Sequence, residues 1–283
     1  MKILISGASG YLGSHLVKSL SSKHQVVALI RTSSSKLRLK NLPVDIVYLD
    51  EDGALEKVFQ KHKPEIVINT AALYGRKGEE VSDLVGANID FPVKLLALAN
   101  LFKCKAFINT GTSLPDNISP YALTKNTFVN LAKLNANVVP KFINIALEHF
   151  YGPEDDATKF TSYVINSCLK DEELKLTSGE QQRDFIYIDD VVSAYEIIVS
   201  NISKLEAFES IPVGSGECPT VRALVEMIHK CSHSKSKLEF GAIGMRANEL
   251  MYSCADTFKL RQLGWKPKHS LESGINTILT GNK

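Results

Sequence analysis

The sequence lacks the features that mark membrane proteins and nucleic-acid-binding proteins. Its 33 Lys and Arg residues nearly balance its 31 Asp and Glu residues, and the net charge of +2 is spread without a long basic run. This balance gives no electrostatic reason to expect a nucleic acid or an anionic membrane as partner. No apolar run approaches the length of a membrane span, and Met1 leads directly into a strand-like segment. We therefore expect no membrane segment, no signal peptide and a cytoplasmic location.

Cysteines are few and lie far apart in the sequence. No two of them have the spacing of a zinc site or a redox pair. We therefore expect reduced thiols that pack as small apolar side chains, and no metal site. The five are Cys104, Cys168, Cys218, Cys231 and Cys254. Internal repeats and low-complexity segments are also absent, and 283 residues suffice for one large α/β domain or two smaller ones.

Strand-like and helix-like segments alternate through the first half of the sequence. The strand-like segments are continuous runs rich in Val and Ile, which is typical of strands buried on both faces of a parallel sheet. Because helical patterns lie between them, the sequence predicts a doubly wound α/β (Rossmann) fold. The expected strands are 2–8, 25–30, 45–50, 65–72, 106–111 and 141–149, and the main helices are 11–23, 53–62, 85–102 and 121–134.

This alternation changes after about residue 151. A polar loop, "YGPEDDATK", precedes a helical segment and several short strand-like segments. We therefore expect a dinucleotide-binding domain over 1–150 and a smaller C-terminal substrate-binding lobe over 151–283. Segments near 184–215 are expected to return to the first domain.

A glycine-rich turn, "GASGYLG", follows the first expected strand. Gly7 permits the tight turn, Gly10 lets a pyrophosphate approach the backbone, and Gly13 lets helix and strand pack closely. The start of the helix then faces the anion. The alternative is a purely structural glycine turn, which the strand–turn–helix context disfavours. Ser9, Tyr11 and Leu12 complete the predicted cofactor loop.

The end of the second strand points to the form of the cofactor. NAD sites usually carry an acidic residue there, but this sequence has Ile30 followed by Arg31. A guanidinium suits a 2′-phosphate, so we expect NADP(H) rather than NAD. The alternative is a solvent-exposed arginine in a loop that tolerates NAD. Asp50, at the end of the third strand, is a candidate for the adenine edge.

Tyr121 and Lys125 lie four residues apart, on one face of an expected helix. A phenol with a pKa of about 10 becomes more acidic beside an ammonium group, and it can then exchange a proton near neutral pH. Thr112 and Ser113, at the end of the preceding strand, offer hydroxyls for a substrate carbonyl. A Tyr and a Lys at this spacing are common on surface helices. Here they follow a glycine-rich turn and a hydroxyl-rich strand end, which favours a catalytic role.

These motifs resemble those of the extended short-chain dehydrogenase/reductase family, whose members include nucleotide-sugar epimerases, dehydratases and reductases. "GASGYLG", "NTAA", "SPYALTK" and "RDFIYIDD" carry the resemblance, which covers essentially the whole chain. It implies that Tyr121 is the acid/base, that Lys125 lowers the pKa of Tyr121 and holds the nicotinamide ribose, and that Thr112 orients the carbonyl. Thr110 and Ser113 are the alternatives to Thr112, and Ala71 and Ala72 would lie close to the cofactor.

Two departures from the family pattern limit which of the family's reactions we expect this chain to catalyse. The connection between Thr112 and Tyr121 is shorter than in typical epimerases. Ser113 and Leu114 stand where the family's dehydratases have an Asp–Glu pair, so the chain lacks the acid/base pair for eliminating water. The resemblance therefore favours an oxidoreductase of a carbonyl group over a dehydratase.

The resemblance also implies an anionic substrate. Arg183 and Arg246 match two family positions at which arginines bind the diphosphate of a nucleotide sugar, a task suited to the guanidinium fork. The alternative for each is a surface ion pair. His149 replaces a family Asn near the sugar, where it contacts the substrate or serves only the structure. Tyr74, with Arg76 beside it, lies in the loop after the fourth strand, close to the expected sugar.

Within the family, several segments look closest to the CDP-3,6-dideoxyhexose reductases, and "GTSLP" and "NELMYSCAD" favour the paratose-forming branch. That likeness implies NADPH-dependent reduction of CDP-4-dehydro-3,6-dideoxy-D-glucose, a step in lipopolysaccharide O-antigen synthesis. The alternatives are the abequose-forming branch, an epimerase that retains NAD, and a non-catalytic NADP-sensing or RNA-binding member, which would not need Tyr121 and Lys125. The family also implies a homodimer.

Overall fold

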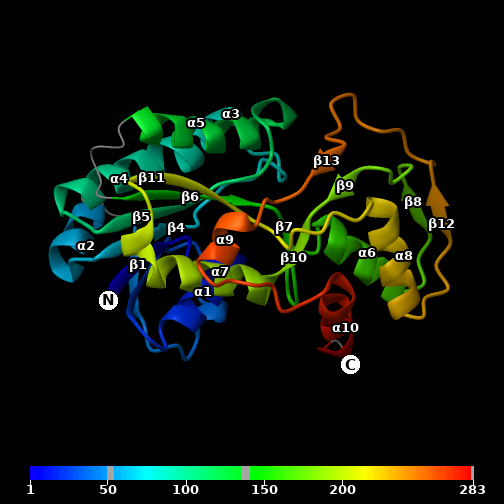
Figure 1. Cartoon of the computed structure of the whole chain (residues 1–283), viewed down its shortest axis with the longest axis horizontal. Helices are drawn as coiled ribbons and strands as arrows, with labels where there is room; N and C mark the ends of the chain where they lie inside the picture. Colours follow the sequence, from blue (N-terminus) through cyan, green and yellow to red (C-terminus); the bar gives the residue numbers. More distant parts are fainter. Residues whose placement is uncertain (50–53, 135–140, 282–283) are drawn as a thin grey trace. The chain divides into compact units, whose positions relative to one another are not determined.

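The protein is described by a computed structural model that covers residues 1–49, 54–134 and 141–281 (Figure 1). The chain forms two compact units. Unit 1 comprises Met1–Ala146 and Tyr195–Ile211, and unit 2 comprises Leu147–Ala194 and Pro212–Lys283.

Unit 1 is built on a seven-stranded sheet with the order β11-β6-β5-β4-β1-β2-β3. The pairs from β3 to β6 are all parallel, with Leu4 of β1 opposite Val27 of β2 and Val67 of β4. This order confirms the doubly wound fold predicted from the sequence. The strands are β1 Lys2–Ser6, β2 Gln25–Ile30, β3 Asp45–Tyr48, β4 Ile66–Asn69, β5 Ala106–Thr110, β6 Phe142–Leu147 and β11 Phe208–Val213.

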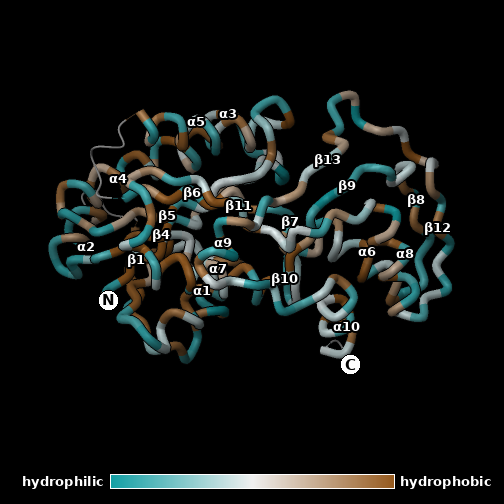
Figure 2. Tube along the Cα trace, viewed as in Figure 1, coloured by the Kyte–Doolittle hydropathy of each residue, from teal (hydrophilic) through white to brown (hydrophobic). Residues whose placement is uncertain are grey.

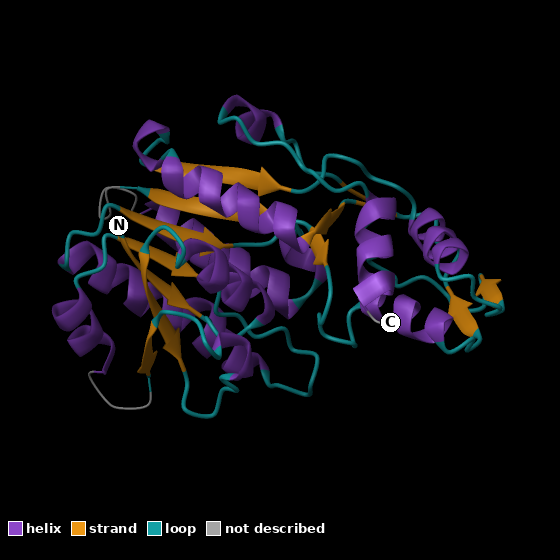
Figure 3. Cartoon of the chain, turned by 90° about the horizontal axis from the view of Figure 1, so that it is seen from below, coloured by secondary structure: helices purple, strands orange, loops and turns teal. Residues whose placement is uncertain are grey.

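Helices cover both faces of this sheet, with α5 on one side and α1 on the other (Figures 1 and 3). One face forms an apolar core in which Leu4, Val67 and Phe107 pack against Phe59 and Leu95 of the covering helices. Figure 2 shows the apolar residues concentrated along β1, β4 and β5. The elements are α1 Tyr11–Leu20, η1 Leu37–Leu39, α2 Ala54–His62, α3 Val81–Val85, η2 Gly86–Asp90, α4 Phe91–Leu101, η3 Asp116–Ile118, α5 Pro120–Leu134, α7 Ile188–Ser200 and η4 Ile202–Lys204.

One helical stretch, Val81–Leu101, is long and apolar enough to span a membrane by length and composition. The sequence had not suggested such a span. The stretch packs on the sheet, where Leu95 and Ala99 are fully buried in the core of unit 1. Other apolar side chains of the stretch are exposed, among them Val81, Val93 and Leu101, so packing within the protein accounts for only part of its apolar character.

A ladder of side-chain hydrogen bonds crosses the sheet of unit 1. Asn69 of β4 donates to Asn109 of β5 at 3.0 Å, and Asn109 donates to Asn144 of β6 at 3.1 Å. Ser6 of β1 and Ser210 of β11 extend the ladder at its two ends, at 2.7 and 3.0 Å. The buried amides of Asn69, Asn109 and Asn144 are thus each hydrogen-bonded to neighbours in the ladder, which fixes the strands beside one another.

Unit 2 combines helices with three two-stranded parallel sheets, β10–β7, β12–β8 and β13–β9. The buried Trp265 donates its indole N–H to Ser193 Oγ at 2.9 Å. The elements are β7 His149–Tyr151, α6 Phe160–Leu169, β8 Leu174–Leu176, β9 Gln182–Arg183, β10 Phe185–Tyr187, α8 Val221–Cys231, β12 Leu238–Phe240, β13 Tyr252–Ser253, α9 Phe258–Gln262 and α10 Leu271–Gly281, together with the first part of α7.

Two cysteines of unit 2 differ from the sequence-based expectation of reduced thiols. Cys218 and Cys254 form a disulfide, with their Cα atoms 5.7 Å apart, whereas Cys104, Cys168 and Cys231 are free. The buried carboxylate of Asp184 lies beside the pair and accepts the backbone N–H groups of Ser215, Gly216 and Ala255. The expectation was wrong because the pairing depends on the fold, which brings together residues 36 apart in sequence.

Candidate active site

The glycine-rich loop between β1 and α1 has the shape of an anion-binding turn. Gly7 has φ +68°, and a Cβ atom there would lie 2.6 Å from the backbone nitrogen of Ala71. A Cβ at Gly13 would lie only 2.2 Å from the Gly7 carbonyl oxygen. Helix α1 has no side-chain cap and no acidic residue in its first turn. The loop therefore fits a dinucleotide pyrophosphate, because backbone and helix dipole are both open to an anion.

The other residues predicted to bind the cofactor lie in this loop or directly after β4. Tyr11 is half-buried, and Leu12 is buried in the first turn of α1. Ser9 is half-buried within the turn itself. Ala71 and Ala72 follow β4, the strand next to β1, and both are half-buried. Small residues there leave space beside the glycine loop at the carboxyl edge of the sheet.

Arg31 directly follows β2 and is exposed, so its guanidinium is accessible to a ligand. Sequence reasoning missed a second arginine: Arg38 lies over the ring of Tyr11, with its guanidinium carbon 5.5 Å from the ring centroid. Because Arg38 and Tyr11 are 27 residues apart in the sequence, no local pattern indicated this contact. Two guanidinium groups therefore occur near the cofactor loop. Asp50, the candidate for the adenine edge, lies outside the described residues.

The connection from β5 to α5 carries the hydroxyl groups. Thr112 Oγ1 accepts the backbone N–H of Leu114 at 3.3 Å, and Ser113 is half-buried beside it. Asn126 of α5 holds this connection by donating to the Leu114 carbonyl at 2.9 Å. Thr110, the alternative to Thr112, is instead engaged with the buried Tyr195 hydroxyl at 2.7 Å. The geometry leaves Thr112 and Ser113 as the hydroxyls better placed to bind a ligand.

Tyr121 lies in the first turn of α5 and stacks on Tyr74, with ring centroids 4.8 Å apart. Burial is the largest of the causes that raise the pKa of Tyr121 well above its usual value, and the neighbouring Tyr74 phenol is the next. The Arg76 guanidinium acts in the opposite direction. We had expected Lys125 to lower this pKa, but Lys125 is not among the main causes of the shift. The pKa rises because the loss of solvation on burial outweighs the effect of nearby positive charge in the protein without a bound ligand. Tyr121 is thus a protonated phenol at neutral pH.

Lys125 lies one turn further along α5 and is only 2% exposed. Burial lowers the pKa of its ammonium group to about 8. A buried ammonium carries a desolvation cost that a hydrogen-bonding ligand would relieve. Lys125 therefore fits a role in holding the hydroxyl groups of a bound ligand next to Tyr121.

Sequence reasoning also missed Asn88, which is buried in the π-helical turn η2. Its amide accepts the N–H of Leu73 and donates to the Leu73 carbonyl, both at 2.9 Å, and donates to Thr124 Oγ1 at 3.0 Å. Asn88 thereby links Leu73 to Thr124, the residues that directly precede Tyr74 and Lys125 in the sequence. A polar Asn within the apolar segment "VGANIDF" was the available signal.

In unit 2, Arg183 is 6% exposed and its guanidinium is already engaged. It donates to Glu249 Oε1 and to the Gln182 carbonyl, both at 2.8 Å, and to the Leu250 carbonyl. Arg246 lies in the same segment as Glu249 and is exposed. The ion pair considered as the alternative for Arg183 is therefore present, and the accessible guanidinium is that of Arg246.

His149 begins β7, and its Nδ1 lies 3.6 Å from Glu148 Oε2. The Glu148 carboxylate in turn accepts the hydroxyl of Ser253 at 2.8 Å. The buried Nδ1 has no hydrogen-bond partner among the described residues. A half-buried imidazole with this capacity fits a contact to a polar ligand.

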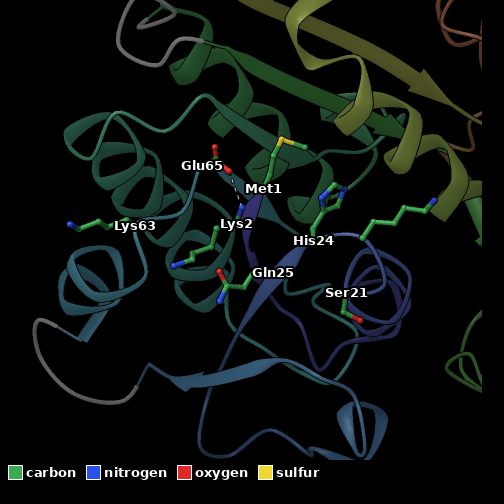
Figure 4. Close-up of a pocket in the computed structure, with 8 residues that line it drawn as sticks. Met1, Lys2, Ser21, His24, Gln25, Lys63 and Glu65 are labelled. Atoms are coloured by element: carbon green, nitrogen blue, oxygen red, sulfur yellow. Dashed lines mark hydrogen bonds between the residues drawn. The ribbon is translucent and has the colours of Figure 1, made fainter.

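A pocket on unit 1 lies at the opposite edge of the sheet (Figure 4). Lys2 at the start of β1 and Gln25 at the start of β2 line it, and the Lys2 backbone N–H donates to Glu65 at 3.0 Å. These are the amino ends of the strands. Ligands of doubly wound folds bind at the carboxyl ends, so this pocket is not the cofactor site.

Comparison with known proteins assigns the chain to a class. Residues 3–214 match the model of the NAD dependent epimerase/dehydratase family, and the chain belongs to that family. It is 33% identical to the CDP-abequose synthases of Salmonella muenchen, over 99% of this chain and 97% of that protein, and of Salmonella typhimurium LT2, over 98% and 97%. The family predicted from the motifs is thus confirmed.

Solved structures match the fold. The UDP-glucose 4-epimerase of Thermotoga maritima with UDP-glucose gives a TM-score of 0.87 at 24% identity, covering 99% of this chain and 98% of that one. The UDP-glucuronic acid 4-epimerase of Bacillus cereus, in complex with UDP-glucuronic acid and NAD, gives 0.86 at 25% identity over the whole of both chains.

Proposed function

We propose that this protein is an NADPH-dependent reductase of a nucleotide sugar, which converts CDP-4-dehydro-3,6-dideoxy-D-glucose to CDP-paratose. The observation that carries the reaction type is the position of the Tyr121 phenol in the first turn of α5, one helical turn from the buried ammonium group of Lys125. A group that is fully protonated at rest is suited to donating a proton, which is what reduction of a carbonyl requires.

Each residue has a defined task in this reaction. When bound, NADPH supplies the hydride that reduces the C4 carbonyl. Thr112 donates a hydrogen bond to that carbonyl, and Tyr121 gives its proton to the oxygen as the charge develops. Lys125 holds the ribose hydroxyls, and its positive charge stabilises the tyrosinate that remains. The glycine loop, with Ala71 and Ala72 beside it, holds the pyrophosphate.

The substrate is anionic at its diphosphate, and we assign Arg246 and Arg183 to it. Arg246 is exposed, whereas Arg183 would exchange its contact with Glu249 for the phosphate oxygens. His149 has an unused ring nitrogen for a polar contact, and Ser113 and Tyr74 supply hydroxyls. The names of the curated relatives support a CDP-linked dideoxy sugar as the substrate class.

A second candidate product is CDP-abequose, which is favoured by the similarity to the two CDP-abequose synthases of Salmonella. The two products differ only in configuration at C4, so the same residues serve both. An epimerase would instead retain its nicotinamide cofactor through a full cycle and would release no oxidised cofactor.

One experiment separates these functions. The protein is incubated with CDP-4-dehydro-3,6-dideoxyglucose and NADPH, and the C4 configuration of the product is determined from proton NMR couplings. An equatorial hydroxyl supports paratose, and an axial hydroxyl supports abequose. If NADPH is not consumed and the purified protein carries tightly bound NAD, the reductase proposal is wrong.

The proposal of NADPH over NADH rests on Arg31, with Arg38 nearby. Replacing Arg31→Asp should shift the preference toward NADH, because a carboxylate repels a 2′-phosphate and binds ribose hydroxyls. The ratio of kcat/KM for the two cofactors is the measurement, with Lys94→Ala on the exposed face of α4 as control. An unchanged ratio would remove Arg31 from the cofactor site.

We also propose a homodimer formed through α3 and α5. These helices pack together in unit 1 and expose Val81, Val85 and Leu123, which are 59, 41 and 50% exposed. Burying such side chains against a second copy is favourable. Light scattering should give twice the chain mass, and Leu123→Glu should produce monomers.

A further inference from the structure

Unit 2 buries a carboxylate, that of Glu148, to which the proposed reaction gives no task. Its side chain is 3% exposed and lies directly before β7 in the sequence. Both of its oxygens accept the hydroxyl of Ser253 in β13, at 2.8 and 2.9 Å, and no other hydrogen bond reaches them from the described residues. A carboxylate can accept about four hydrogen bonds, and burying one with a single donor is costly. Glu148 therefore has the capacity for a further donor.

The imidazole of His149 lies next to this carboxylate. Its Nδ1 atom is buried, has no hydrogen-bond partner among the described residues, and lies 3.6 Å from Glu148 Oε2. A shift of about 0.5 Å, within ordinary side-chain motion, brings the two atoms within hydrogen-bond distance. The ring of Phe185 packs beside the imidazole, with centroids 5.9 Å apart. A buried acceptor and a buried ring nitrogen thus face each other, and one hydrogen bond satisfies both.

The outer edge of the His149 ring is open. The side chain is 38% exposed although Nδ1 is buried, and among the described residues no hydrogen bond engages Nε2. A ligand therefore meets Nε2, while Nδ1 faces the protein. In a neutral imidazole one nitrogen carries the proton and the other accepts, and the partner of one nitrogen decides the role of the other.

Glu148 also acts on Arg183. Burial lowers the pKa of the Arg183 guanidinium, and the carboxylates of Glu249 and Glu148 act in the opposite direction. The carboxylate thus lies behind two side chains that we assign to the substrate, Arg183 and His149. The alternative role is structural, in which Glu148 only holds β13 through Ser253. A neutral side chain could accept that hydroxyl without the cost of a buried charge, which favours a role toward the charged and polar residues of the site.

We infer that Glu148 is a positioning residue for substrate binding: it accepts the Nδ1–H of His149, so that Nε2 accepts a hydrogen bond from a substrate hydroxyl. The identity of the substrate rests on the proposed function, whereas the pairing of Glu148 with His149 does not. A lone pair at Nε2 repels phosphate oxygens and selects a hydroxyl group.

The proposed substrate offers few such hydroxyls. Its sugar lacks hydroxyls at C3 and C6 and has a carbonyl at C4, so the C2 hydroxyl is the free donor of the sugar. The ribose of the CDP group carries the others. Both sources have the same chemistry, and a comparison of the whole substrate with CDP alone separates them.

The first test needs no turnover. In protein labelled with 15N at histidine, NMR at pH 8.5 reports which ring nitrogens of His149 carry protons, with the signals assigned from His149→Asn. We expect a proton on Nδ1 and none on Nε2. Glu148→Met removes the acceptor and should shift the ring toward the tautomer protonated at Nε2. A proton on Nε2 in the wild type, or the same spectrum in both proteins, would overturn the inference.

Two further variants separate positioning from structural support. Ser253→Ala removes the link to β13 and leaves the carboxylate, so the His149 tautomer should stay as in the wild type. Glu148→Gln keeps the shape and a weaker acceptor, so it should give a smaller shift than Glu148→Met. Glu172→Gln, at a side chain 54% exposed in the same unit, is the matched control. A tautomer change in Ser253→Ala as large as that in Glu148→Met would favour the structural role and contradict the inference.

The second test is kinetic. Glu148→Met should raise the KM for CDP-4-dehydro-3,6-dideoxyglucose by about 10-fold, the usual effect of one hydrogen bond, with kcat and the Kd for NADPH nearly unchanged. A matching loss of affinity for CDP assigns the hydroxyl to the ribose, and an unchanged affinity for CDP assigns it to the sugar. An unchanged KM would overturn the substrate contact. Absence of NADPH oxidation by the wild type would count against the proposed function instead, and the NMR spectra would still decide the pairing.

Discussion

Asn88 donates its side-chain amide to Thr124 Oγ1 at 3.0 Å, and this buried bond joins the π-helical turn η2 to helix α5. The same amide makes two hydrogen bonds to the backbone of Leu73. Tyr74 directly follows Leu73 in the sequence, and Lys125 directly follows Thr124. Both belong to the proposed site. One side chain therefore sets the spacing between the loop after β4 and the helix that carries Tyr121.

Replacing Asn88→Leu should reduce both stability and turnover. The change leaves the Leu73 backbone groups and the Thr124 hydroxyl without their partner, which costs about 2–3 kcal/mol of the free energy of unfolding. Displacement of α5 should lower kcat by about 10- to 100-fold. Urea unfolding and steady-state kinetics measure the two effects, with the exposed Asn276→Ala as control. Unchanged kcat in a destabilised variant would limit Asn88 to a structural role.

Gly13→Ala should weaken NADPH binding and destabilise unit 1. Its Cβ would lie 2.2 Å from the Gly7 carbonyl oxygen, so the glycine loop must move. A forced shift of this kind costs about 1–3 kcal/mol. Gly86→Ala is the control, because a Cβ there meets nothing within 4 Å and alanine favours a helix by about 1 kcal/mol. Equal NADPH affinity in the two variants, measured by fluorescence titration, would contradict the loop assignment.

Lys125→Met should abolish activity and yet stabilise the cofactor-free protein. The pKa of Lys125 is lowered to about 8 by burial, so between pH 8 and its unfolded value of 10.5 the unfolded chain binds more protons than the native one. Stability contributed by this site therefore rises with pH across that window, by up to about 3 kcal/mol in all. The variant's advantage should be largest at pH 7 and shrink by pH 9.5.

The measurement for this prediction is the difference in free energy of unfolding between the variant and the wild type from pH 7 to 9.5. Taking the difference removes the groups that titrate in both proteins, such as Cys104, whose pKa burial raises to about 11. A difference that does not change with pH would show that Lys125 titrates normally in the native protein.

The pairing of Cys218 with Cys254 predicts a thiol count. Denatured but unreduced protein should show only the thiols of Cys104, Cys168 and Cys231, and reduction should raise the count to the five of the sequence. Cys218→Ser should then leave one additional free thiol, at Cys254. Five reactive thiols before reduction would contradict the disulfide.

The features that the sequence predicted correctly are those with a local signature. The alternating strands and helices gave the doubly wound sheet, because buried parallel strands are recognisable one at a time. The motifs after β1 and at the start of α5 pointed to the family, because each spans a single turn or helix. The roles assigned to Tyr121, Lys125 and Thr112 stay predictions.

The features that it missed depend on contacts between distant segments. Asn69, Asn109 and Asn144 each follow apolar residues in a strand, but only the strand order makes their amides a continuous ladder. The raised pKa of Tyr121 likewise depends on burial and on Tyr74, 47 residues earlier, and not on the nearby Lys125. A spacing of four residues shows which side chains share a helix face, but it does not measure how deeply they are buried.

The most direct test of the proposed reduction compares the wild type with Tyr121→Phe, using CDP-4-dehydro-3,6-dideoxyglucose and NADPH. The variant keeps the ring and loses only the proton that Tyr121 is proposed to donate. Turnover should fall by about two to four orders of magnitude, with the Kd for NADPH nearly unchanged. Wild-type turnover in Tyr121→Phe would contradict the account, because the C4 oxygen would then receive its proton from another group.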